Sequence, residues 1–167
     1  MLNNIMTEGE CSKLRSLIHH ANNIVLCCHV SPDGDAIGSV LGMAEVLKCM
    51  GKEPVMVVPD QFPDYLQWLP NTEKIVRYDK RSDYVDMVLK IADLVICLDF
   101  NALSRTDDME AALEACTAPR VLIDHHLNPS IACQVCVSHP NMSSTSELVF
   151  RVAWQLGLFE QLGRHFA

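Results

Sequence analysis

Cys28–Ser39 reads CHVSPDGDAIGS and follows directly on the apolar run Ile24–Cys27. Four apolar residues are enough for a buried strand and too few for a helix. Pro32 and Gly34 interrupt the backbone, and a helical pattern follows from about Ala36 onward. The sequence therefore predicts a turn that leads from a buried strand into a helix.

This turn carries one imidazole and two carboxylates, on His29, Asp33 and Asp35. Gly34 can adopt a positive φ without steric cost, and such a turn would aim both carboxylates at one point. Carboxylates that lie so close repel each other unless one is protonated or a cation lies between them. We interpret the turn as half of a metal site.

Apolar strands alternate with helices along the rest of the chain, and no repeats are visible. Strands that are apolar almost throughout indicate an α/β fold, with a parallel sheet covered by helices on both faces. Helices are expected over residues 7–21, 36–50, 84–92, 108–116 and 144–156, and strands over 24–27, 54–59, 74–78, 93–99, 120–126 and, at the sheet edge, 134–137.

The composition suits one domain of 167 residues with a sizeable core, since 49% of the residues are apolar and 20% are charged. The net charge of −8 disfavours a broad nucleic-acid surface and long single-stranded DNA, although a small phosphate ligand could bind through a metal. No signal peptide is visible, and no apolar run reaches the about 20 residues of a membrane span. We therefore expect a cytoplasmic protein without a membrane partner. Most of the eight cysteines fall in expected strands and helices, as reduced, buried thiols do.

Three of the apolar strands end in residues that can bind a metal. The first is followed by His29, Asp33 and Asp35, the second by Asp99, and the third by Asp124-His125-His126. Sites in open parallel sheets form at the carboxyl ends of the strands, so these distant residues are expected to meet at one edge. Their combined charge implies divalent cations. Carboxylate and imidazole ligands without thiolate favour Mn²⁺, with Mg²⁺, Co²⁺ or Fe²⁺ as alternatives and Zn²⁺ left open.

The ordered motifs resemble those of the DHH phosphoesterase family. The matching residues are His29-x-x-x-Asp33-Gly-Asp35-Ala-x-Gly38-Ser39, then Asp99 after an apolar strand, then Asp124-His125-His126. The stretch Ser143–Glu147 is similar to the oligoribonuclease and phosphoadenosine-phosphate phosphatase branch of that family. The resemblance runs from about residue 20 to the end, and it implies a Rossmann-like DHH domain with hydrolase activity.

The resemblance also implies two Mn²⁺ ions and hydrolysis of a phosphoester by a metal-activated hydroxide. It places His29 and Asp33 on one ion, Asp35 and His125 on the other, and Asp99 as a bridge between them. Asp99 and His126 would be the catalytic groups, with His126 nearer the substrate phosphate. Asp124 would orient an imidazole, as carboxylates behind metal ligands commonly do.

Two further residues are candidates for contacts with phosphate. Arg105 is the cation that follows closely on Asp99, and an ion pair with Asp107 or Asp108 is the alternative. Ser39 lies near the expected start of a helix, where backbone N–H groups can bind phosphate, and a plain capping role is its alternative.

One motif of the family is not visible in this sequence, an aspartate near the end of a later strand that completes the shell of the second ion. Leu158–Ala167 contains no such strand, and the family's substrate-binding second domain is also missing. We therefore interpret residues 1–167 as a DHH catalytic domain that is incomplete and truncated at its C-terminus. The second ion is expected to bind weakly and hydrolysis to be impaired.

Several alternatives stay open. The substrate could be short RNA, 3′-phosphoadenosine 5′-phosphate, a cyclic dinucleotide or, least favoured, pyrophosphate, and a homodimer is left open. A catalytically weak module that binds metal or nucleotide is the main rival. Gly34–Gly38 opens a helix after a strand but lacks the G-x-G-x-x-G spacing of a dinucleotide-binding turn. Cys133 and Cys136 supply only half of a zinc site.

Overall fold

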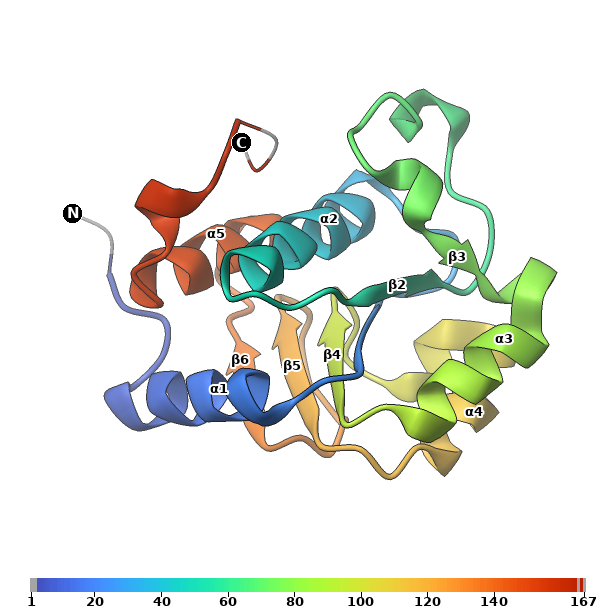
Figure 1. The fold of residues 1–167 in the computed structure, drawn as a ribbon, viewed down its shortest axis with the longest axis horizontal. Coiled ribbons are helices and arrows are strands. Elements are labelled where there is room, and N and C mark those ends of the chain that lie inside the picture. Colours follow the sequence, from blue (N-terminus) through green and yellow to red (C-terminus); the bar gives the residue numbers. More distant parts are fainter. Residues whose placement is uncertain (1–2, 165, 167) are drawn as a thin grey trace.

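The computed structural model describes residues 3–164 and 166, and its core is a sheet of six parallel strands (Figure 1). The strands are β1 (Ile24–Cys27), β2 (Val55–Val58), β3 (Val76–Arg77), β4 (Leu94–Leu98), β5 (Arg120–Asp124) and β6 (Val135–Ser138). The helices are α1 (Glu8–His20), α2 (Gly34–Cys49), α3 (Tyr78–Ile91), α4 (Glu110–Ala115) and α5 (Thr145–Gln155). Among the described residues, no helix combines the length and the apolar character that a membrane crossing needs. The predicted α/β fold is confirmed.

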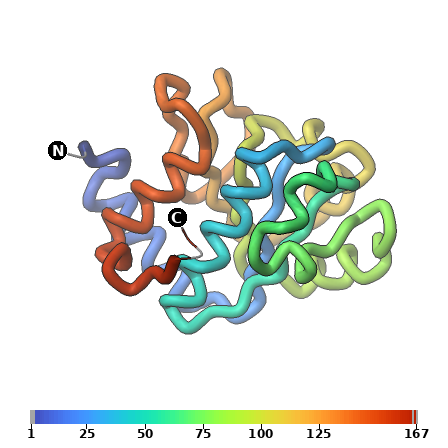
Figure 2. Tube along the Cα trace, turned by 90° about the horizontal axis from the view of Figure 1, so that it is seen from above, coloured from blue at the N-terminus to red at the C-terminus, as the bar shows by residue number. Residues whose placement is uncertain are grey.

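Helices cover both faces of the sheet, so the core has two layers. Successive side chains of a strand point to opposite faces, and neighbouring residues therefore enter different layers. Leu26 of β1 and Ile96 of β4 pack with α1, α2 and α5, whereas Val25 and Cys97 pack with α3 and α4. Both views place α2 and α5 side by side on one face (Figure 1, Figure 2). Burial on both faces explains why the strands are apolar almost throughout.

The chain reverses its direction across the sheet at β1, because the strand order is β3-β2-β1-β4-β5-β6. From β1 the chain passes through α2 to β2 and β3, which lie on one side of β1. From β3 it returns through α3 to β4, which pairs with β1 on its other side. Right-handed crossovers in opposite directions place their helices on opposite faces. The loops after β1 and β4 therefore diverge at the carboxyl ends of the strands, where ligands bind in such folds. The carboxyl end of β5 reaches the same edge, since β5 pairs with β4.

Local sequence signals fix the ends of the two helices that flank this edge. Asp33 is the N-cap of α2 and Ser144 the N-cap of α5, and each side chain accepts backbone N–H groups of the first turn. Gly51 follows the C-cap of α2 with a φ of +74°, a conformation that glycine adopts without strain. The predicted helix stop at Gly51 is thus confirmed.

The region around β3 differs from the expectation. The strand expected over 74–78 is reduced to the two residues of β3, and α3 begins at Tyr78 rather than at residue 84. Charged residues fill the first turn of α3, and a kink at Arg81 (φ −141°) separates it from the remainder of the helix. Apolar periodicity therefore marks only the second part of α3.

The helix expected over 108–116 begins later, at Glu110. The preceding residues, Leu103–Met109, form 3-10 turns, and Asp107 has a φ of 50°. The 3-10 turns continue past Asp107 to Met109, so residues 108 and 109 are lost from the expected α-helix.

We expect Ile96→Ala to lower the free energy of unfolding by about 2–5 kcal/mol, because Ile96 is fully buried in the central strand β4. The matched control is Ile91→Ala at the end of α3, where the side chain is 54% exposed. Its effect should stay within about 0.5 kcal/mol. Urea denaturation followed by circular dichroism measures both losses. Equal losses in the two variants would contradict the two-layer core.

Candidate metal centre

The turn between β1 and α2 is held by side chains of its own and by Asp60. His29 is buried, and Ser31, two residues further along the chain, has a φ of 52°. The Ser31 N–H donates to Asp60 Oδ1 at 2.6 Å, which stabilises this left-handed conformation. The expectation of a positive φ at Gly34 is wrong, because Asp33 caps α2 and Gly34 is already its first helical residue. Ser31 reverses the chain instead.

Asp33 uses one carboxylate oxygen as the helix cap. Its Oδ1 accepts the N–H groups of Asp35 (2.9 Å) and Ala36 (3.0 Å). Among the described residues its Oδ2 accepts no hydrogen bond, so this oxygen is available at the edge of the sheet. One side chain can therefore start α2 and still offer a metal ligand.

Asp99 lies at the centre of the site, directly after β4. It is 2% exposed and has a φ of 65°, a conformation that aspartate adopts more readily than most residues. Its Oδ2 lies 3.5 Å from His29 Nε2, and its Oδ1 lies 3.6 Å from His125 Nε2. The two oxygens of Asp99 thus face two different imidazoles.

Two groups of three ligand-type residues share Asp99. One comprises His29, Asp33 and Asp99, the other Asp99, His125 and His126, and in each group the ligand atoms lie within 4.8 Å of one another. Atoms bound to a common ion at about 2.1 Å lie about 3–4 Å apart, so both groups could hold a cation after small adjustments. Asp35 belongs to neither group, but its Oδ2 lies 3.6 Å from His125 Nε2.

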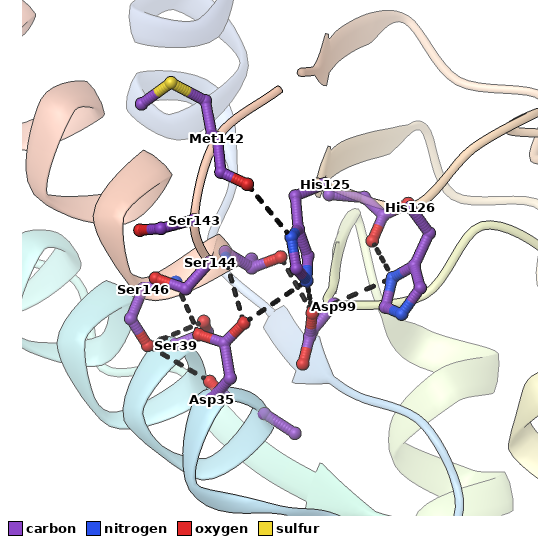
Figure 3. Close-up of polar contacts among 12 residues, drawn as sticks. Asp35, Ser39, Asp99, His125, His126, Met142, Ser143, Ser144 and Ser146 are labelled. Carbon is purple, nitrogen blue, oxygen red and sulfur yellow. Dashed lines mark hydrogen bonds and ion pairs between the residues drawn. The ribbon is translucent and has the colours of Figure 1, made fainter. Parts of the chain in front are cut away.

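His29 and His125 face Asp99 through Nε2. The ring of His126 instead faces Asp99 through Nδ1, at 3.9 Å (Figure 3). In each ring Nδ1 contacts an oxygen that can only accept a hydrogen bond, so Nδ1 carries a proton, and in the neutral ring Nε2 has a free lone pair. The acceptors are Val30 O for His29 (2.7 Å), Met142 O for His125 (3.3 Å) and Asp124 Oδ1 for His126 (2.7 Å). An unprotonated Nε2 is the form of histidine that binds a divalent cation.

Asp124 is fully buried behind His126. Its Oδ1 accepts the His126 Nδ1–H, whereas Oδ2 has no hydrogen-bond partner among the described residues. A buried carboxylate oxygen without a partner is costly, so the negative charge of Asp124 needs a nearby positive charge. A cation at the adjacent group would supply it.

Electrostatics at the edge of the sheet favour positive charge. Burial alone would lower the pKa of His29, but the hydrogen bonds with Asp99 and the Val30 carbonyl, together with the charges of Asp99 and Asp33, outweigh it and raise this pKa. Burial raises the pKa of the Cys28 thiol well above its usual value, and the carboxylates of Asp99, Asp33 and Asp60 raise it further. Both shifts have the sign that a negative local potential produces. Divalent cations would neutralise that potential.

The two residues predicted to contact phosphate have different surroundings. Arg105 is half-buried, and its carbonyl accepts the Val30 N–H at 2.8 Å, so it lies beside the His29 turn. In the described part of the chain its guanidinium forms no ion pair with Asp107 or Asp108. Ser39 is fully buried in the second turn of α2, and its hydroxyl lies 3.3 Å from Ser146 Oγ.

Sequence reasoning missed the contacts that α5 makes with the site. Thr145 Oγ1 donates to Asp99 Oδ1, and the N–H groups of Thr145 and Ser146 donate to the Asp35 carboxylate, all at 2.8 Å. The available signal was the helix predicted to start at residue 144, after the third strand that ends in ligand-type residues. It predicts a helix terminus but not the carboxylates that it faces.

Comparison with known proteins agrees with this geometry. The model of the DHH family, N-terminal domain, matches residues 23–165. The bifunctional oligoribonuclease and PAP phosphatase NrnA of Thermus thermophilus is 33% identical over 129 residues, which are 75% of this chain and 35% of that protein. The chain thus spans about a third of the length of this curated relative.

Solved structures share the fold. The crystal structure of an exopolyphosphatase-related protein from Bacteroides fragilis matches with a TM-score of 0.95 and 39% identity, over 99% of this chain and 48% of that one. Two crystal structures of the exonuclease RecJ with manganese, one of them from Thermus thermophilus, match with a TM-score of 0.53 and 14% identity. They cover 97% and 93% of this chain, and 41% and 21% of theirs.

The order of the motifs, the shared Asp99 and the matches over most of the chain agree with one another. The chain therefore belongs to the DHH family, and its residues 23–165 match the N-terminal domain of that family.

Proposed function

We propose that residues 1–167 form a DHH catalytic domain that hydrolyses short oligoribonucleotides or 3′-phosphoadenosine 5′-phosphate with the help of divalent metal ions. The observation that carries this proposal is the position of Asp99, whose two oxygens face the two groups of ligand-type residues. A carboxylate so placed is suited to bridge two ions. The NrnA relative, whose printed name gives both activities, supports the substrate class.

In this proposal His29 and Asp33 hold one ion, Asp35 and His125 hold the other, and Asp99 bridges them. A pair of divalent ions would lower the pKa of a bound water and stabilise the charge that develops on the phosphoryl oxygens. The mixture of carboxylate and imidazole favours Mn²⁺, with Mg²⁺, Co²⁺ or Fe²⁺ as alternatives. Manganese is also the metal of the RecJ structures, which share only the fold.

The chain's own residues would orient the substrate. His126 is half-buried beside Asp99, and its Nδ1–H donates to Asp124. When the ring is also protonated at Nε2, that N–H would donate to a phosphate oxygen. Arg105 lies next to the His29 turn without an ion pair to its neighbours Asp107 and Asp108, and it offers a second phosphate contact. The net charge of −8 opposes binding of a long polyanion, so a small substrate suits the chain better.

We expect Asp99→Asn to lower Mn²⁺-dependent hydrolysis more than about 100-fold, because residues that only orient metal ligands already contribute about 10- to 100-fold. Asparagine also tolerates the φ of 65° at this position, so the fold should persist. The matched control Asp83→Asn removes an exposed carboxylate of α3 and should leave hydrolysis unchanged. Cleavage of a 5′-phosphorylated diribonucleotide, followed by chromatography with Mn²⁺ or with EDTA, measures the effect.

Parallel assays with 3′-phosphoadenosine 5′-phosphate, a cyclic dinucleotide and pyrophosphate separate the substrate classes. Hydrolysis of pyrophosphate and of no other substrate would contradict the nucleotide assignment. The pyrophosphate assay is included because a similar solved structure is that of an exopolyphosphatase-related protein. Metal binding without turnover of any of them would favour the rival, a module that binds metal or nucleotide.

We expect Asp124→Asn to lower the rate of hydrolysis about 10- to 100-fold, because the buried carboxylate fixes the tautomer and orientation of His126. If Asp124 acts through that imidazole, the same substitution should have little further effect in a His126→Ala background. Rates of the two single variants and the double variant form the cycle that tests this. Fully additive losses would show that Asp124 acts on another group.

A further inference from the structure

We infer that the first turn of α5 positions the carboxylates of Asp35 and Asp99 for metal binding, and that Thr145 is the central positioning residue. The inference rests on the proposed function, because it concerns the same carboxylates. It gives a role to the stretch Ser143–Glu147, which contains none of the proposed metal ligands.

The Asp35 carboxylate is bound by the backbone of α5. Its Oδ2 accepts the Thr145 N–H at 2.8 Å. Its Oδ1 accepts the Ser146 N–H, also at 2.8 Å (Figure 3). Two donors on two oxygens fix the plane of the carboxylate as well as its position. The N-terminal end of a helix also stabilises negative charge. Asp35 is therefore held as an oriented anion, with Oδ2 facing His125 at 3.6 Å.

The Asp99 carboxylate is bound by the side chain of the same helix turn. Thr145 Oγ1 donates to Asp99 Oδ1 at 2.8 Å, and both residues are buried. A threonine hydroxyl has a single proton, so this contact commits it to Asp99. Thr145 thus contacts both carboxylates at once, Asp35 through its backbone and Asp99 through its hydroxyl.

The packing of α2 against α5 keeps this turn in place. Ser146 Oγ donates to the Asp35 carbonyl at 3.2 Å and lies 3.3 Å from Ser39 Oγ. A Cβ at Gly38 would lie 3.0 Å from Ser146 Oγ, so the absence of a side chain there permits the close approach. Gly38 and Ser39, at the end of the stretch CHVSPDGDAIGS, are therefore explained as the surface that receives α5.

The expected consequence of losing the hydroxyl is weaker metal binding. Without the Thr145 hydroxyl, Asp99 Oδ1 loses its fixed donor, and the carboxylate must be ordered by the ion itself. Thr145→Val keeps the shape of the side chain, whereas Thr145→Ser keeps the hydroxyl. We expect Thr145→Val to raise the Kd for Mn²⁺ about 10- to 100-fold, as the loss of groups that orient metal ligands typically does. We expect Thr145→Ser to bind close to the wild-type affinity.

Isothermal titration of the full 167-residue chain with Mn²⁺ measures these affinities, and thermal unfolding without metal reports stability separately. The matched control is Thr72→Val, which also removes a buried hydroxyl. This hydroxyl donates to the Leu69 carbonyl at 2.9 Å and has no contact with the two carboxylates among the described residues. The control substitution should lower stability and leave the Mn²⁺ affinity unchanged. Thr145→Ala serves as a second variant if Thr145→Val does not fold. High Mn²⁺ should restore hydrolysis by the Thr145 variant.

The outcomes separate this inference from the proposed function. Wild-type affinity in Thr145→Val or Thr145→Ala, with hydrolysis intact in the wild type, would overturn the positioning role alone. A loss of affinity in Thr72→Val as large as in Thr145→Val would also overturn it, because the effect would then follow from stability. A wild-type chain that binds no Mn²⁺ would overturn both proposals.

Discussion

Burial of negative charge at the end of β4 is the constraint on which the rest of the structure depends. Asp99 is 2% exposed and cannot be left without compensation, because an unpaired charge in the interior is strongly destabilising. The sheet order offers a way to meet this demand, since β4 lies between β1 and β5 and each neighbour brings an imidazole to one carboxylate oxygen, so that a cation could be held between them. The reversal of the chain at β1 is therefore the reason why residues about a hundred positions apart meet at this edge of the sheet.

The sequence predicted what local chemistry determines. Apolar runs identify β1, β4 and β5, and the ligand-type residues at their ends follow from the rule that sites lie at the carboxyl ends of parallel strands. The contact between Thr145 and Asp35 could not be predicted in this way, because the two residues are 110 positions apart and meet only when α2 packs on α5. The left-handed conformation at Ser31 was missed for a related reason, since it depends on Asp60 in another loop.

Several side chains at this edge would serve both stability and the proposed metal binding. Asp33 starts α2 with one oxygen and leaves the other to the site, and Asp35 joins α2 to α5 while it faces His125. Substitution of either carboxylate would therefore disturb a helix terminus as well as a ligand set. A loss of activity on substitution of Asp33 or Asp35 can therefore be assigned to metal binding only when the free energy of unfolding of the same variant is unchanged.

The acceptors behind the three imidazoles are of two kinds, and this has a consequence for how the site can vary. His29 and His125 donate to the main-chain carbonyls of Val30 and Met142, which every amino acid at those positions would supply. His126 donates to a side chain, that of Asp124. Substitution of Asp124 can thus change the basicity of the His126 ring. Substitutions of Val30 and Met142 leave the carbonyl acceptors of the other two rings in place. Divergence of chemistry within this architecture would be expected to begin at His126.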